Sequence, residues 1–226
     1  MSKIAAPISN DFCPQTLYLY GTYREDGTPN FGLFCWMSYY WDTELGVMAC
    51  IEGKKLTRDM IRKNGVFSAN LVTEELLPLA DFLGNTEGYS GEKSGIALET
   101  EPGAVLQVPL LKASPVSFEL EVAQSFHQGT SNIFLCRIRN VMVEEALMDS
   151  DTSIEERMRV IAPIHTTCST YFSWNGHTIG AWGEPQNSFR ASMCEQTGDS
   201  LADCSWREGN KVDSGACDGD RNGRVK

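Results

Sequence analysis

The stretch KKLTRDMIRKNGVFSANL, residues 54–71, decides the fold, because a helix and a strand follow one another in it. Thr57 predicts the N-cap of a helix through RDMIRKN, and Gly65 predicts its end. Five basic residues fall within ten positions here, although the chain has a formal net charge of −11. A helix N-terminus offers free amides and the positive end of a dipole, which suits a phosphate or another anion. A solvated amphipathic helix with its bases in water explains the window equally well.

The segments on either side of this stretch read as strands joined by tight turns. They are rich in aromatic, β-branched and other apolar residues, and Glu25-Asp26-Gly27 supplies a hairpin turn. The predicted strands are 16–24, 31–38, 45–52, 66–72, 116–126 and 132–148. They predict a mainly β fold, a mostly antiparallel barrel with short helices in its connections.

The remaining connections hold two short helices, a long loop and a final hairpin. Thr73 predicts the start of a helix to about Phe82, which Pro78 should kink or shorten. Ser153 with Glu156 forms a capping box for a helix through about Val160. The other expected elements are a long loop over 83–112 and a β-pair of 169–174 with 177–182, turned at Asn175-Gly176.

The composition predicts one domain over 1–185, followed by a polar, disordered tail over 186–226. The whole chain is 42% hydrophobic, enough for a core, whereas the tail is rich in Gly, Ser and Asp and has almost no apolar periodicity. The acidic balance argues against nucleic acid and anionic membrane surfaces as partners. No apolar run approaches the roughly 20 residues that span a bilayer. We therefore expect a reduced, cytoplasmic protein, because the N-terminus also lacks the apolar core of a secretory signal.

Several motifs with a known chemistry are missing from the sequence. It contains no G-x-G-x-x-G, no Walker spacing, no G-x-S-x-G and no H-E-x-x-H. Its eight cysteines form no C-x-x-C pair and it has three histidines, so we expect no metal site. Nucleotide-binding Rossmann, hydrolase and metalloenzyme functions therefore have no support.

One aromatic segment, FCWMSYYW over residues 34–41, suggests a site for a flat ligand. Strand alternation would place Phe34, Trp36 and Ser38 on one face, with Cys35, Met37 and Tyr39 on the other. A planar ring could then lie beside Trp36. An ordinary barrel core explains the same residues.

Four segments in order resemble the flavin reductase-like, FMN-binding split-barrel family, which includes the flavoredoxins. They are PNFGLFCWMS, KKLTRDMIRKNGVFSANL, LADFLGNTEGYSGEKSG, and API followed by Tyr171 and IGAWG. The resemblance covers about residues 10–185. It implies a six-stranded antiparallel split β-barrel that forms a homodimer, with FMN in a groove near the subunit interface. It also implies hydride transfer from NADH or NADPH to flavin, or onward electron transfer from bound FMN.

The resemblance assigns site residues by position in this sequence. Those implied to line the isoalloxazine and ribityl region are Asn30, Trp36, Met37 and Ser38. Thr57, with Lys55 and Arg58 close by, falls at the phosphate position. The others are Asn70 in the strand after the helix, Ser90 and Lys93 in a second phosphate-side loop, and His165 and Tyr171 near the flavin edge. No catalytic acid or base is assigned.

The predicted function is that of an NAD(P)H-dependent flavin reductase. The main alternative is an FMN-containing electron carrier that is reduced by a protein partner and has no nicotinamide site. A barrel that has lost its cofactor is a third reading. The surplus of bases in KKLTR would attract the phosphates of a nicotinamide cofactor, although surface solvation explains it as well.

Overall fold

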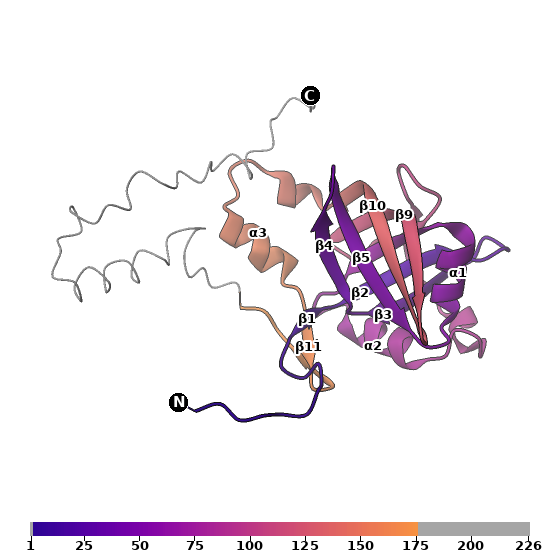
Figure 1. The fold of residues 1–226 in the computed structure, drawn as a ribbon. Helices are drawn as coiled ribbons and strands as arrows, with labels where there is room; N and C mark the ends of the chain where they lie inside the picture. Colours follow the sequence, from indigo (N-terminus) through magenta and orange to yellow (C-terminus); the bar gives the residue numbers. More distant parts are fainter. Residues whose placement is uncertain (1, 176–226) are drawn as a thin grey trace. The chain divides into compact units, whose positions relative to one another are not determined.

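A computed structural model describes residues 2–175, without the side chains of residues 94 and 95. Its main element is a seven-stranded antiparallel sheet (Figure 1). In spatial order the strands are β3 (Pro29–Phe34), β2 (Tyr18–Tyr23), β6 (Val66–Leu71), β9 (Val116–Gln128), β10 (Ser131–Val143), β5 (Leu45–Glu52) and β4 (Met37–Trp41). The expected mainly β, antiparallel fold is confirmed. The predicted boundary at residue 185, the tail and the strand 177–182 lie outside the described residues.

Cys35 and Trp36 carry the chain from one edge of this sheet to the other, because β3 and β4 are its two outer strands. Three Cα steps join Phe34 to Met37, so these two strand ends lie within about 11 Å of each other. The sheet is therefore rolled into a barrel, and no ladder pairs β3 with β4 in the described part of the chain, which leaves the barrel split there.

The predicted continuous strand over 31–38 is wrong for the same reason. The Met37 N–H donates to the Cys35 carbonyl at 3.0 Å, a tight turn that interrupts the strand. One expected strand thus becomes two, which changes the strand count from six to seven. The simple alternation expected for Phe34, Trp36 and Ser38 does not continue across this turn.

Two smaller sheets correct the expected loops. β7 (Thr100–Pro102) pairs with β8 (Pro109–Leu111), and a 3₁₀ turn η1 (Glu92–Gly95) precedes them, so 83–112 is not a plain loop. The third sheet is formed by β1 (Gln15–Thr16), β11 (His165–Thr167) and β12 (Thr170–Phe172). Its hairpin turns at Cys168 and Ser169, both at positive φ. The expected turn at Asn175-Gly176 extends beyond the described residues and stays a prediction. β10 also ends earlier than expected, before the 3₁₀ turn η2 (Glu145–Met148).

Helix α1 (Leu56–Asn64) begins one residue before the expected cap, Thr57. Lys55 is its N-cap residue and makes no side-chain capping bond, so the prediction of Thr57 as N-cap is wrong. Thr57 instead lies in the first turn and is buried. The expected glycine stop is confirmed, because Gly65 has φ 72° and its N–H donates to the Ile61 carbonyl at 2.9 Å.

Helix α2 (Leu77–Asn85) starts later than the predicted Thr73, whereas helix α3 (Ile154–Ile161) starts as predicted. Pro78 lies in the first turn of α2, where a proline does not kink a helix. Helix α3 has the predicted capping box, in which Ser153 and Glu156 bond reciprocally. None of the helices in residues 2–175 is long and apolar enough to cross a membrane.

The core has two parts. The barrel interior holds Tyr20, Val47, Ile61, Phe67 and Phe134, all fully buried. A second cluster, which includes residues of β2, β3 and α2, lies where α2 packs on β3 (Figure 1). Burial of these side chains provides the main stabilisation of the fold.

Buried polar side chains connect the sheet to the chain between β7 and β9. The carboxylate of Glu119, in β9, accepts the backbone N–H groups of Ala104, Val105 and Leu106 at 2.9, 3.0 and 2.6 Å, and the Asn140 amide at 2.8 Å. Burial alone would raise the pKa of Glu119, but these hydrogen bonds hold it below its ordinary value. Glu119 therefore fixes this connection as an ionised group.

Candidate functional site

A small pocket lies between the start of α1 and the end of α2. It is lined by backbone and side chains from β3, α1, α2 and the loop before η1: Gly32, Leu33, Phe34, Lys54, Lys55, Leu56, Thr57, Leu83, Gly84, Asn85, Thr86, Glu87, Gly88 and Lys93. Its volume is about 70 Å³. A group of the size of a phosphate fits in this volume. We call it the α1–α2 pocket.

Hydrogen-bond donors from α1 face this pocket. The Asp59 N–H makes the first intrahelical bond, to the Lys55 carbonyl, so the amides of the preceding turn have no helical acceptor. Thr57 is 4% exposed, and its Oγ1 accepts a bond from Asn30 Nδ2 at 3.0 Å. The Thr57 O–H is thereby left to donate. Asn30 is oriented in turn by Arg24, whose Nη2 donates to its Oδ1 at 3.4 Å.

Lys93 brings a cation to the same pocket. Its Nζ donates to the carbonyls of Phe31, at 3.3 Å, and Leu83. An ammonium group has three donors, so one remains for a ligand. Burial, with repulsion from Lys55 and Arg24, lowers the pKa of Lys93, and Glu87 opposes this only weakly. An anion would relieve this concentration of positive charge.

Gly32 allows the backbone of β3 to pass close to Thr57 at the side of the pocket. A Cβ at this position would lie 2.8 Å from Thr57 Oγ1 and 2.9 Å from the Phe34 ring. The β3 backbone therefore approaches the Thr57 hydroxyl more closely than any larger residue allows. The φ of Gly32 is not in the left-handed region, so its backbone conformation does not require glycine. The lack of space for a Cβ does.

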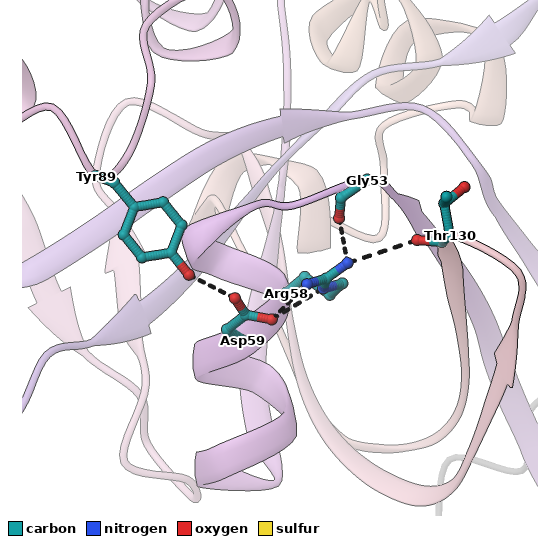
Figure 2. A network of polar contacts seen from close by, with 5 residues as sticks. All are labelled: Gly53, Arg58, Asp59, Tyr89 and Thr130. Atoms are coloured by element: carbon teal, nitrogen blue, oxygen red, sulfur yellow. Dashed lines mark hydrogen bonds and ion pairs between the residues drawn. The ribbon is translucent and has the colours of Figure 1, made fainter.

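Two predicted site residues serve the framework instead. Arg58 turns away from the α1–α2 pocket: it pairs with Asp59 and donates to the carbonyls of Gly53 and Thr130 (Figure 2). The expected phosphate contact of Arg58 is therefore not supported, because its donors are occupied by a carboxylate and by chain turns. Arg58 is also absent from the pocket lining.

Asn70, in β6, is fully engaged inside the protein. Its Nδ2 donates to the Leu19 carbonyl and to Ser68 Oγ, both at 2.9 Å. Its Oδ1 accepts from the Leu111 N–H at 2.9 Å and from Ser117 Oγ at 2.8 Å. These four bonds use its two donors and both lone pairs, so the expected flavin contact has no free group. Asn70 joins β2, β6, β8 and β9.

Comparison with known proteins agrees with this architecture. Residues 10–157 match the model of the flavin reductase like domain. The chain belongs to this family. A flavoredoxin of Methanosarcina acetivorans has a similar structure, with a TM-score of 0.72 at 21% identity over 83% of this chain and 100% of that one. An FMN-binding protein of Thermus thermophilus has a TM-score of 0.64 at 20% identity, over 80% of this chain and 98% of that one.

A curated relative matches only part of this chain and about half of its own length. An uncharacterized protein of Aeropyrum pernix is 25% identical over 139 residues, which is 57% of this chain. The match spans 53% of that protein's own length.

Within the aromatic segment 34–41 of this flavin reductase-like domain, Phe34 lines the pocket, whereas Trp36, Met37 and Ser38 do not. Trp36 lies at the crossing from β3 to β4 and is 40% exposed, and its carbonyl accepts the Cys50 N–H at 2.9 Å. Met37 begins β4 and packs against the barrel core, and Ser38 is exposed. None of the three lines the α1–α2 pocket.

Ser90, His165 and Tyr171 also lie outside the pocket lining. Ser90 Oγ donates to the Glu87 carbonyl at 2.8 Å, within its own loop. His165, in β11, has a buried Nε2 with no hydrogen-bond partner among the described residues. The Tyr171 hydroxyl donates to Asp81 Oδ1 at 2.5 Å; burial and this bond raise the pKa of Tyr171 to about 12.

The structure thus brings together Lys55, Thr57 and Lys93, with Asn30 bound to Thr57. Sequence reasoning missed Arg24, Gly32 and the Asn85-Thr86 pair. Asn85 ends α2 and Thr86 follows it, inside a segment already singled out for the resemblance, but no local pattern shows that these two residues line the pocket. Arg24 reads only as the end of a strand.

Proposed function

We propose that this protein is an FMN-binding oxidoreductase that passes a hydride from NADH or NADPH to flavin. The observation that carries the proposal is the meeting of Thr57, Lys55 and Lys93 in one pocket at the start of α1, within the family-matched region. These residues come from segments far apart in the chain, and their donors suit one phosphate group.

The α1–α2 pocket fits the phosphate end of FMN. A phosphate monoester carries about −1.5 to −2 charge at neutral pH, and the pocket is lined by Lys54, Lys55 and Lys93. Thr57 and the open amides of α1 add neutral donors. With the phosphate in the pocket, the ring would lie in the direction of Trp36, which follows the lining residue Phe34 by two positions.

The protein's part in the reaction would be binding and orientation. Bound FMN would supply the hydride-accepting chemistry. Lys93 and Thr57 would hold the phosphate, and Trp36 would provide an apolar edge for the ring. We assign no acid or base: Tyr171 keeps its proton at neutral pH, because its pKa is about 12.

The exposed large apolar side chains of β4 and β5 support a homodimer as part of this proposal. Tyr39 and Trp41 are 55% and 75% exposed on an edge strand, and Leu45 and Met48 are exposed on its neighbour. Large apolar side chains gathered on an open edge favour association. Sedimentation at several protein concentrations tests this, and a monomer at all of them would contradict it.

A second candidate is an electron carrier that receives electrons from a protein partner and has no nicotinamide site. The observation that favours it is the structural similarity to the flavoredoxin of Methanosarcina acetivorans. The same FMN site would serve both functions.

One experiment separates the candidates. The purified chain is reconstituted with FMN, freed of unbound flavin and mixed anaerobically with NADH or NADPH while the visible flavin absorption is followed. Rapid bleaching is the expected result for a reductase, whereas flavin that stays oxidised indicates the carrier. A protein that retains no FMN at all would refute both.

A further inference from the structure

Tyr89 lies in the loop between α2 and η1, residues 86–91, which forms one side of the α1–α2 pocket. Its neighbours Glu87 and Gly88 line the pocket, and Tyr89 itself does not. The loop rests on the start of α1, because a Cβ on Gly88 would lie 2.7 Å from the Cβ of Leu56. The position of this loop therefore determines the shape of the pocket.

The Tyr89 hydroxyl attaches this loop to α1. It donates to Asp59 Oδ2 at 2.5 Å (Figure 2). The other oxygen of Asp59 accepts from Nε and Nη2 of Arg58 at 2.9 and 2.8 Å. Arg58 in turn donates to the carbonyl of Gly53, just after β5, and to that of Thr130, between β9 and β10. The acceptor of Tyr89 is thus fixed to the sheet.

The protonation states agree with this geometry. Burial alone would raise the pKa of Asp59, but the hydrogen bonds from Tyr89 and Arg58 outweigh it and lower the pKa. The bond to Asp59 raises the pKa of Tyr89. Tyr89 is therefore a donor to an ionised carboxylate at neutral pH, which is a charge-assisted bond.

Tyr89 also contacts a pocket lysine. The Lys54 ammonium lies 5.2 Å from the centroid of the Tyr89 ring, within the range of a cation–π contact. Lys54 lines the α1–α2 pocket. One side chain outside the pocket thus positions both a pocket cation and the backbone of the wall.

We propose that Tyr89 is a positioning residue for the phosphate pocket: its bond to Asp59 and its ring beside Lys54 hold the loop closed and slow the release of the bound phosphate group. This rests on the proposed function, since the phosphate is that of FMN. Tyr89 does not touch the phosphate. It acts through the loop and through Lys54.

The test compares FMN with riboflavin, which has the same ring and no phosphate. Release of each flavin is measured by the recovery of its fluorescence in stopped-flow dilution, for the wild-type chain, Tyr89→Phe and Tyr89→Leu. Tyr89→Phe removes only the hydroxyl, and Tyr89→Leu also removes the ring. Tyr23→Phe is the matched control, because the Tyr23 hydroxyl has no hydrogen bond to any described residue and Tyr23 does not line the α1–α2 pocket.

The expected result is a change for FMN alone. Tyr89→Phe should release FMN about threefold to tenfold faster, Tyr89→Leu faster still, and riboflavin and the Tyr23→Phe control should be unchanged. Equal acceleration of both flavins would show a general structural effect and overturn the inference, as would FMN release at the wild-type rate. A wild-type chain that binds no FMN would refute the proposed function itself, before any variant is compared.

Discussion

Replacing Lys93 by methionine is the most direct test of the α1–α2 pocket. Methionine keeps an apolar stem of similar length and removes the ammonium group. In the structure this group has two carbonyl acceptors, on Phe31 and Leu83, and one donor left over. The leftover donor is the part of Lys93 that we assign to the FMN phosphate.

The size of the effect follows from that single bond. A hydrogen bond to a charged group is worth about 1.5–3 kcal/mol, so Lys93→Met should weaken FMN binding by about tenfold to a hundredfold. The change also removes a donor to the Leu83 carbonyl, one of the last four of α2, which should lower the free energy of unfolding by about 1 kcal/mol. The two effects must be separated.

Riboflavin separates them, because it lacks the phosphate. FMN and riboflavin are titrated by quenching of flavin fluorescence, and the ratio of their dissociation constants is compared between variants. Lys63→Met is the matched control: it removes a lysine from the same basic segment, but Lys63 is exposed, pairs with Glu25 and lies outside the pocket lining.

The ratio decides the outcome. For Lys93→Met the preference for FMN over riboflavin should fall by the full tenfold to hundredfold, and for Lys63→Met it should change by less than about threefold. If Lys93→Met keeps the wild-type preference, Lys93 does not hold the phosphate, and the pocket reasoning is wrong. Equal weakening of both flavins would contradict it as well, since only the framework would have changed.

Three further predictions follow from the geometry. Gly32→Ala should reduce the preference for FMN over riboflavin, because the new Cβ would lie 2.8 Å from Thr57 Oγ1 and displace it; titration of both flavins measures this, and an unchanged preference would contradict it. Asn70→Ala should lower the free energy of unfolding, measured in urea, by about 2–4 kcal/mol, because it leaves buried groups unpaired. A variant with wild-type stability and weaker FMN binding would contradict this and would support the expected contact of Asn70 with FMN. Glu119→Gln should cost about 1–3 kcal/mol at neutral pH. The folded-state pKa of Glu119 lies below its ordinary value, so its contribution is present above about pH 4.3 and is lost as the pH falls further; urea unfolding should show the two proteins converging in acid.

Elements with strong local signals were predictable from the sequence. The capping box of Ser153 and Glu156 and the glycine stop at Gly65 depend only on neighbours along the chain, and both are confirmed. The strand 45–52 was predicted with its observed bounds, because its apolar run ends at charged and glycine residues. These signals do not need knowledge of the rest of the fold.

The break at Cys35 and Trp36 was not predictable in this way. Most residues of 31–38 are apolar or aromatic and favour a strand, and the turn arises because the two edges of the sheet must meet at this point. Closure of a barrel is a property of the whole sheet. Local propensity therefore gave one strand where the fold has two.

At the site, too, the type of a residue was readable from the sequence, but its surroundings, which decide its role, were not. Arg58 and Lys93 are both cations in segments that resemble phosphate sites, yet the structure uses them differently. The planar fork of Arg58 matches the Asp59 carboxylate, and its remaining donors reach two chain turns, so it supports the wall of the pocket. The ammonium of Lys93 donates to two carbonyls and keeps a donor, so it can take an anion. In a chain of net charge −11 an anion site must be local, and three lysines around about 70 Å³ provide it. Loss of Lys93 should therefore act on the phosphate directly, whereas loss of Arg58 should act through Asp59 and the Tyr89 loop.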